Sequence, residues 1–484
     1  MRPTNSQMDL WPSYGLEMNW NTVFNGSKAG EAFQPPSSKL TAMGACYEPS
    51  NHGFNGPLAT CVSPHMVTGD VHDIFNATFK ALGIPPRCDL NGGELRGFAM
   101  QMTTQDGNAD VREDAARAYY YPFEDRPNLR AMVQTTGTRI LWSKSKHSKG
   151  KGNTDKAIIA TGVEIINQAG EIAVVHANRE VILSAGAIRT PAILEHSGIG
   201  NANILSQFAI PTIIDLPAVG ENFQDQSVLA VSATFSSRNY TGFPVFVAHT
   251  SLTDLFGNQT STIYEQTLAK IPEYAAQIAA SNHNSSTAAT QELILKSQLD
   301  LLMHTNTPAS EIAPIALANA LYTVFWPLHP FSRGSIHISS TNASTPPTID
   351  SRFLTIDFDL HLAIATLKFI RNKFLTTPPL SSIIDPLTIT PDFSLVPANA
   401  SDEEWMNWIR VNGSVAPNSH HLGTCAMLPR ERGGVVDNEF RVYGTGNVRV
   451  VDMSVVPVQV AGHSTALLYG IAEWAARKIR KDIG

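Results

Sequence analysis

The C-terminal segment 446–483 constrains the fold most, because its pattern changes from strand to helix within a short distance. The run VRVVD (448–452) is typical of a buried strand, and the loop MSVVPVQVAGH (453–463) follows it. Ser464 and Thr465 are residue types that cap helix N-termini. The sequence therefore predicts a helix that begins at Ser464, directly after His463. Its apolar face is formed by Ala466, Leu467, Gly470, Ile471, Trp474 and Ile479.

Three further stretches have definite patterns. A helix is predicted over 71–84, within a region (1–110) that is otherwise irregular. The segment 157–187 alternates with period two around NQAG, which indicates a hairpin followed by a buried strand. A helix is then expected to begin near Thr190 and Pro191, because proline suits a first helical turn, and to end at the glycines of SGIG.

Size, charge and hydropathy exclude several classes of function. The chain has 484 residues, 43% of them apolar, which is enough for a large core and more than one domain. A net charge of -7 argues against nucleic-acid binding. The most apolar stretch, 312–328, is interrupted by Pro314, Asn319 and Pro327. We therefore expect a buried strand or helix there, and no membrane span.

The cysteines indicate neither a zinc site nor a redox dithiol, because none of them forms a CxxC pair. Three of the four lie in the first hundred residues and can supply one disulfide, but the sequence does not determine the pairing. The four are Cys46, Cys61, Cys88 and Cys425.

Glycosylation signals point to the secretory pathway, because eight Asn-X-Ser/Thr sequons are present. The first residues, MRPTNSQMDLW, have no apolar signal-peptide region, so the two observations conflict. Asn342, in SSTNASTPP, is the expected main acceptor, since its surroundings are typical of an exposed turn. The sequons lie at Asn25, Asn76, Asn239, Asn258, Asn284, Asn342, Asn399 and Asn412.

Two adjacent histidines, His420 and His421, lie in the small polar stretch PNSHHLGTCAM (417–427). Adjacent loop residues rarely direct both imidazoles at one ion, so no metal site is expected. An imidazole titrates near neutrality and is therefore suited to removing a hydroxyl proton.

Four stretches in order along the chain resemble the glucose–methanol–choline (GMC) oxidoreductases, especially the fungal glucose-oxidase branch. The resemblance implies an α/β fold, in which a Rossmann-like FAD-binding domain joins a substrate domain with a large mixed or antiparallel sheet. It also implies FAD as the cofactor and a small alcohol as the substrate. The stretches are GAIRTPAILEHSGIG (186–200), LPAVGENFQDQ (216–226), NSHHLGTCAM (418–427) and VVDMSVVPVQVAGHSTALLYGIAEWAA (450–476).

The resemblance assigns roles to individual residues. His420 matches the catalytic base of the family's His-x-x-Gly-Thr segment, and His421 does not. His463 matches the partner that bonds the substrate oxygen. The helix that Ser464 and Thr465 open is expected to direct positive potential at the N1 and C2 carbonyl of reduced flavin. Asp452 matches the aspartate beside the ribityl and diphosphate part of FAD, and Met453 is expected to offer its backbone to the cofactor.

One family signal is absent from the printed sequence: no strand–GxGxxG–helix unit with a ribose-binding acidic residue appears. MRPTNSQMDLW resembles the family just after that unit. We therefore expect an N-terminally truncated chain that lacks the first βαβ unit, about a hundred residues. A truncated gene model is the first explanation, a remnant that no longer binds FAD the second, and a non-redox product the third. The chain as written is expected to purify with little FAD.

The expected organisation is an N-terminal remnant of substrate-domain and lid segments (1–110), a first FAD-binding part (111–225), a substrate-binding domain (226–408) and a C-terminal FAD-binding part (409–484). The expected function is FAD-dependent oxidation of a CH–OH group, with a secondary-metabolite intermediate among the possible substrates. Two alternatives stay open: a non-redox cyclase or lyase of the same fold, and an inactive secreted glycoprotein. The sequence does not distinguish an oxidase from a dehydrogenase and gives no oligomeric state.

Overall fold

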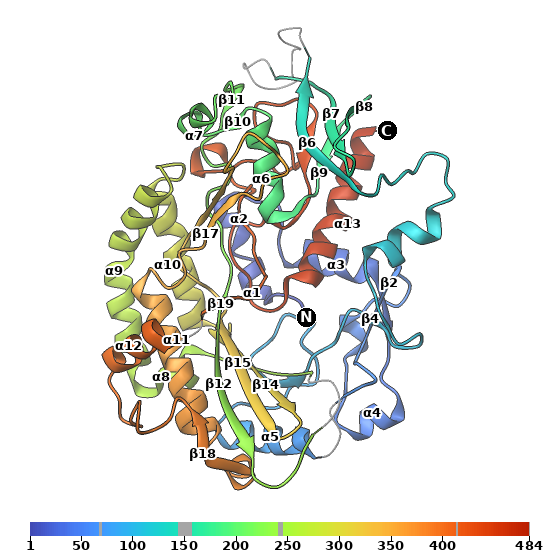
Figure 1. The fold of residues 1–484 in the computed structure, drawn as a ribbon. Helices are drawn as coiled ribbons and strands as arrows, with labels where there is room; N and C mark the ends of the chain where they lie inside the picture. Colours follow the sequence, from blue (N-terminus) through green and yellow to red (C-terminus); the bar gives the residue numbers. More distant parts are fainter. Residues whose placement is uncertain (67–69, 144–156, 241–244, 413–414, 484) are drawn as a thin grey trace.

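The computed structural model describes residues 1–66, 70–143, 157–240, 245–412 and 415–483. Buried apolar side chains of these residues form two large clusters, one around a broad sheet and one around the C-terminal helix. A third, smaller cluster joins the two parts of the molecule, because it contains Trp326 from the sheet and Ala461 from the loop before that helix. The mixed helix-and-sheet fold expected from the sequence is confirmed (Figure 1).

A seven-stranded sheet lies at the centre of the first part, and every printed pairing in it is antiparallel. The predicted buried segment 312–328 forms two of its strands. Alternate residues of β12 are buried, as expected of a strand that packs one face on a core. In order, the strands are β18 (Ile384–Thr390), β12 (Ser227–Phe235), β15 (Ala320–Pro327), β14 (Ser310–Leu317), β13 (Phe246–Thr250) and β3 (Gly97–Met100), with β19 (Ala416–Pro417) paired to β12.

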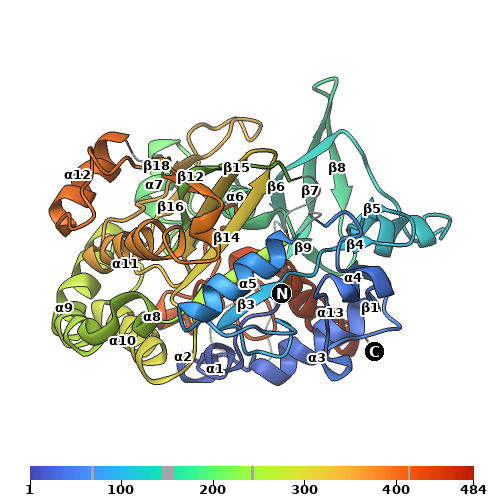
Figure 2. The same cartoon turned by 90° about the horizontal axis from the view of Figure 1, so that it is seen from below.

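Helices supply the other side of this core. The predicted helix 71–84 is confirmed as α5, and Figure 2 shows it next to β3. Its rings Phe75 and Phe79 pack against Phe98, Phe246 and Phe374. The helices of this part are α5 (Val71–Ala81), α8 (Leu252–Phe256), α9 (Thr260–Ser281), α10 (Ala288–His304), α11 (Asp357–Phe369) and α12 (Asp402–Asn412).

The second part contains the predicted hairpin and buried strand, as β7 (Ala160–Asn167), β8 (Ile172–His176) and β9 (Val181–Leu183). β7 also pairs with β6 (Thr135–Trp142) in a three-stranded antiparallel sheet. β9 pairs in parallel with β20 (Val448–Val450), which lies more than 250 residues later in the chain. A parallel pair closed by a helix after β9 is the Rossmann-like element expected of an FAD-binding domain.

The helix after β9, α6 (Gly186–His196), begins earlier than predicted, and Pro191 lies inside it. The start of the helix was predicted wrongly. Pro191 was assigned to the first turn, because deeper in a helix its missing N–H leaves a backbone carbonyl without a partner. The carbonyl of Ala187, four residues before Pro191, instead accepts a bond of 2.6 Å from the hydroxyl of Thr424. The helix ends at His196, and Gly198, with a φ of +80°, follows it as predicted.

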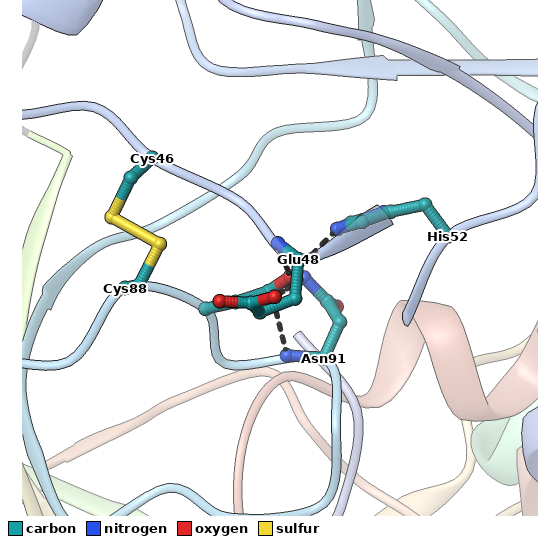
Figure 3. Close-up of a disulfide and its surroundings, with 6 residues drawn as sticks. Cys46, Glu48, His52, Cys88 and Asn91 are labelled. Atoms are coloured by element: carbon teal, nitrogen blue, oxygen red, sulfur yellow. Dashed lines mark hydrogen bonds and ion pairs between the residues drawn. A yellow bond between two sulfur atoms is a disulfide. The ribbon is translucent and has the colours of Figure 1, made fainter. Parts of the chain in front are cut away.

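The N-terminal region is more regular than predicted. It contains an eleven-residue helix, α3 (Trp20–Gly30), whose first turn is capped by the side chain of Asn19. Cys46 and Cys88 form the disulfide (Figure 3), while Cys61 and Cys425 are free and buried. Beside the disulfide, the carboxylate of Asp89 accepts bonds from the backbone of Glu48 and Asn91 and contacts His52.

Helix α3 packs closely on α13 (Ser464–Ile483), the predicted C-terminal helix (Figure 1). Two glycines meet at this crossing. A Cβ atom on Gly26 would lie 2.5 Å from the carbonyl oxygen of Gly470. A Cβ atom on Gly470 would lie 2.7 Å from Oγ of Ser27 and 2.8 Å from the carbonyl of Val23. The approach of α3 therefore fixes the position of α13, the helix that follows His463.

Gly470→Ala is expected to lower the free energy of unfolding by about 1–3 kcal/mol, because the added methyl overpacks a backbone contact. Thermal unfolding followed by circular dichroism measures the change. Gly137→Ala is the control, since a Cβ there would meet only a Val163 methyl at 3.6 Å. Equal stability of the two variants would contradict the close crossing.

Candidate active site

His420 and His463 come together although 42 residues separate them in the chain, and their ring centroids lie 5.1 Å apart. His463 immediately precedes α13, while His420 lies in the loop after β19. The ring of Trp326, from β15, lies 6.4 Å from the ring of His420 and 5.9 Å from that of His463. The pair therefore sits where the sheet of one part meets the C-terminal helix of the other.

Glu311, from β14, holds His463 and is fully buried. Its Oε1 lies 2.8 Å from Nε2 of His463, and its Oε2 lies 3.1 Å from Nε2 of His249. Burial alone would raise the pKa of Glu311, but the two imidazoles outweigh it and lower that pKa well below its usual range. Glu311 is therefore an anion that only accepts hydrogen bonds, so Nε2 of His463 carries a proton.

Backbone and amide contacts orient His420. The carboxylate of Asp225 accepts bonds from the backbone N–H groups of Ser419, at 3.1 Å, and His420, at 2.9 Å. Ser419 has a φ of +63°, a left-handed conformation that these bonds support. Nδ1 of His420 lies 2.8 Å from Oε1 of Gln226.

Gln226 determines which nitrogen of His420 carries the proton. Its amide nitrogen contacts the carbonyls of Val460, at 3.2 Å, and Leu328, at 3.4 Å, so its oxygen must face His420. The amide nitrogen of Asn418 lies 3.0 Å from Oε1 of Gln226 and also 3.0 Å from Nδ1 of His420. Oε1 of Gln226 only accepts and lies nearer to the ring, at 2.8 Å, so Nδ1 of His420 and the Asn418 amide both donate to it, and Nε2 of His420 presents a lone pair.

Burial keeps His420 neutral. It lowers the pKa of His420 to about 4, and the nearby His463 contributes in the same direction. A neutral imidazole with a free lone pair at Nε2 is the state that a general base needs.

The other predicted residues have different surroundings. The ring of His421 stacks against Phe223, with centroids 6.4 Å apart. Asp452 is buried, and its two oxygens accept four bonds, from the backbone N–H and hydroxyl of Ser454, the backbone N–H of Gly186 and the hydroxyl of Thr190. It thus joins the end of β20 to the start of α6. Met453 is buried directly after it.

A cavity of about 440 Å³ opens beside His463. One wall is the first turns of α13, with Thr465, Ala466 and Tyr469, while Ser464 is not among the lining residues. The lining also contains Arg2, Glu31, Asn91 and the segment 101–105. The volume lies in the range of small-molecule and cofactor sites, and the helix N-terminus favours negative charge there.

Sequence reasoning missed three residues of the site: Glu311, Gln226 and Gln101. Gln226 ends the motif LPAVGENFQDQ, which signalled the family but no role for its last residue. Glu311 is an isolated carboxylate within an apolar strand, and that rarity was the only available signal. Gln101 carried no signal at all.

Known proteins match this chain over most of its length. Two family models described as GMC oxidoreductase match residues 1–228 and 330–472. The chain belongs to the GMC oxidoreductases.

Among its relatives, the glucose oxidase-like protein fsoC of Humicola fuscoatra is 39% identical over 99% of this chain and 80% of its own length. Two solved structures, an FAD-dependent oxidoreductase from Chaetomium thermophilum and a fungal aryl-alcohol oxidase, each have a TM-score of 0.86 and 25% identity. Each covers all of this chain, and the chain covers 84% of each.

Membership makes the protein an FAD-dependent oxidoreductase, as the resemblance implied. The residues present fit the ring end of that cofactor, because the cavity combines suitable volume with a helix N-terminus and a histidine. Within the described residues, no helix is long and apolar enough to cross a membrane. Over the same residues, no group of three His, Cys, Asp or Glu side chains is placed to hold a metal ion.

The lowered pKa of His420 predicts that its imidazole stays neutral far below pH 6.5 and takes up a proton only near pH 4. NMR titration of protein labelled with [¹³C]histidine measures this, with the His420→Gln spectrum identifying the signal. Circular dichroism at each pH shows whether the fold persists. A midpoint at or above 6.5 in folded protein would contradict the burial argument.

Proposed function

We propose that the protein oxidises a CH–OH group of a small alcohol, with His420 as the general base. The observation that carries the proposal is the neutral His420 with its Nε2 lone pair, 5.1 Å between ring centroids from His463 at the cavity. An alcohol hydroxyl between the rings would donate its proton to Nε2 of His420. FAD, when bound, supplies the acceptor for the hydride that leaves carbon.

His463 orients the substrate oxygen in this proposal. Glu311 fixes its ring from the buried side, so the opposite edge of the imidazole faces the cavity.

The cofactor would be held by the groups around the cavity. Thr465 and the start of α13 would meet its ring end, where the helix dipole would stabilise negative charge. Ser464 opens that helix, and Asp452 and Met453 are proposed to act through the backbone between β20 and α6, since the Asp452 oxygens already have protein donors.

The experiment is anaerobic reduction of the FAD-loaded enzyme by a panel of alcohols that includes glucose and benzyl alcohol. The relatives motivate both choices. Loss of flavin absorbance with one of them supports the proposal. Turnover of a substrate without any flavin would instead favour a non-redox cyclase of this fold. Complete inactivity would favour an inactive secreted glycoprotein. A second series with oxygen as the acceptor separates an oxidase from a dehydrogenase.

His420→Ala is expected to slow flavin reduction by about 10²–10⁴-fold, the usual effect of losing a general base. His421→Ala is the matched control, because the ring of His421 packs on Phe223 and, among the described residues, no hydrogen bond or ring contact joins it to His420 or His463. Stopped-flow absorbance gives both rates. A larger loss in the His421 variant would mean that the base is assigned to the wrong residue.

We also propose that the protein is a secreted glycoprotein. Asn342 is exposed in a turn, where its backbone oxygen accepts from Thr345 and its side chain from the backbone of Ser344. In contrast, Oδ1 of Asn76, within α5, is buried.

Protein from the native host is therefore expected to carry a glycan at Asn342 and none at Asn76. Endoglycosidase treatment followed by peptide mass spectrometry measures the occupancy of each sequon. A native protein without glycan at any sequon would refute secretion by this route.

A further inference from the structure

Both nitrogens of His463 have partners in the structure. Nε2 bonds to the buried carboxylate of Glu311, and Nδ1 lies 2.9 Å from Nε2 of Gln101. Gln101 follows β3, and its backbone N–H donates to the carbonyl of Val245 at 2.6 Å. Its side chain is half-buried and lines the cavity beside His463. The amide therefore occupies the edge of the imidazole that a substrate needs.

Donors and acceptors at the pair can be counted. Because Glu311 is an anion, Nε2 of His463 carries a proton, and because an amide nitrogen only donates, Nδ1 holds a lone pair that accepts from Gln101. His420 likewise has its proton on Nδ1, bonded to Gln226, and a lone pair on Nε2. The two histidines thus present two acceptors and no donor to a hydroxyl placed between their rings.

An alcohol that gives up its proton requires the opposite arrangement. Its hydroxyl donates to one lone pair, and its oxygen then gathers negative charge that needs a hydrogen-bond donor. The groups that face His463 are Glu311, Gln101, His420 and the ring of Trp326. Of these four, only the amide of Gln101 carries N–H groups that can turn to the cavity, because the indole N–H of Trp326 is buried.

We propose that Gln101 is the donor to the substrate oxygen: its amide bonds to Nδ1 of His463 in the free enzyme and to the alcohol oxygen in the complex. The inference rests on the proposed alcohol oxidation. It assigns Gln101 as a substrate-binding and catalytic residue. His463 is then the acceptor that keeps the amide in place until the substrate arrives, so His463 orients the substrate oxygen through Gln101. The specificity that follows is for a hydroxyl group, which both donates and accepts, over an ether, which cannot donate to His420.

The first test determines the proton position on His463. Protein labelled with [¹⁵N]histidine, with the His463→Gln spectrum identifying the signals, is expected to show a protonated Nε2 and a bare Nδ1 at pH 7. Gln101→Glu replaces the donor with an acceptor of similar size, and is expected to put a proton on Nδ1 as well. An imidazolium in the unsubstituted protein would overturn the proposal, because His463 would then supply the donor itself.

The second test is kinetic and uses whichever of glucose or benzyl alcohol reduces the flavin. Gln101→Met keeps the length of the side chain and removes the donor, so the limiting rate of flavin reduction is expected to fall about 10²-fold. The limiting rate of the Gln101→Glu variant should fall by at least the same factor. Gln277→Met is the matched control, since Gln277 is exposed on α9. An unchanged limiting rate in Gln101→Met would overturn the proposal, and so would a loss confined to KM.

The two tests separate this inference from the proposed function. If neither alcohol reduces the flavin, alcohol oxidation fails for these substrates, and the ¹⁵N spectra alone decide whether Nδ1 of His463 is a bare acceptor. If alcohol oxidation holds but Gln101→Met retains full rate, only the role of Gln101 is lost. Circular dichroism of each variant shows that the fold is intact.

Discussion

The buried carboxylate of Glu311 is the constraint on which the site depends. A charge without solvent is costly unless it is paired and hydrogen-bonded, and Glu311 meets His249 on its own sheet and His463 from the other part of the molecule. β13 supplies His249 and β14 supplies Glu311, opposite each other in antiparallel register. The carboxylate is thus built into the sheet, and the loop before α13 must bring His463 to it.

The side-chain amides of Gln226 and Gln101 determine which histidine nitrogens carry protons. Gln226 cannot turn, because two backbone carbonyls take its N–H groups, and it therefore selects the tautomer of His420. Gln101 has no such second anchor on its side chain in the described contacts, so its amide can exchange partners. Gln226 holds His420 in the tautomer of a base, whereas Gln101 is free to donate to the substrate in the proposed complex. The difference comes from the groups around each amide, since both residues are glutamines.

The sequence predicts what is local or patterned. Periodicity predicted the strand, loop and helix around His463, the helix 71–84 and the hairpin 157–187. The resemblance of the motifs to the family implied FAD and the two histidines. The sequence did not predict Glu311, because its contact with His463 spans 152 residues and no local pattern marks it. The disulfide pairing and the start of α6 were missed for the same reason: the partner of Cys46 and the Thr424 hydroxyl that tolerates Pro191 are set by tertiary packing.

The hydrogen bonds of His463 explain why an amide is useful beside it. Nε2 of the ring bonds to the Glu311 anion, so Nδ1 is the nitrogen that needs a second partner. A carboxylate in the place of Gln101 would put a second negative charge close to a buried anion. An apolar side chain would leave Nδ1 without a partner in a partly dry cavity. A neutral amide satisfies Nδ1 without adding charge, and in the proposed complex it can leave the ring for the alcohol oxygen.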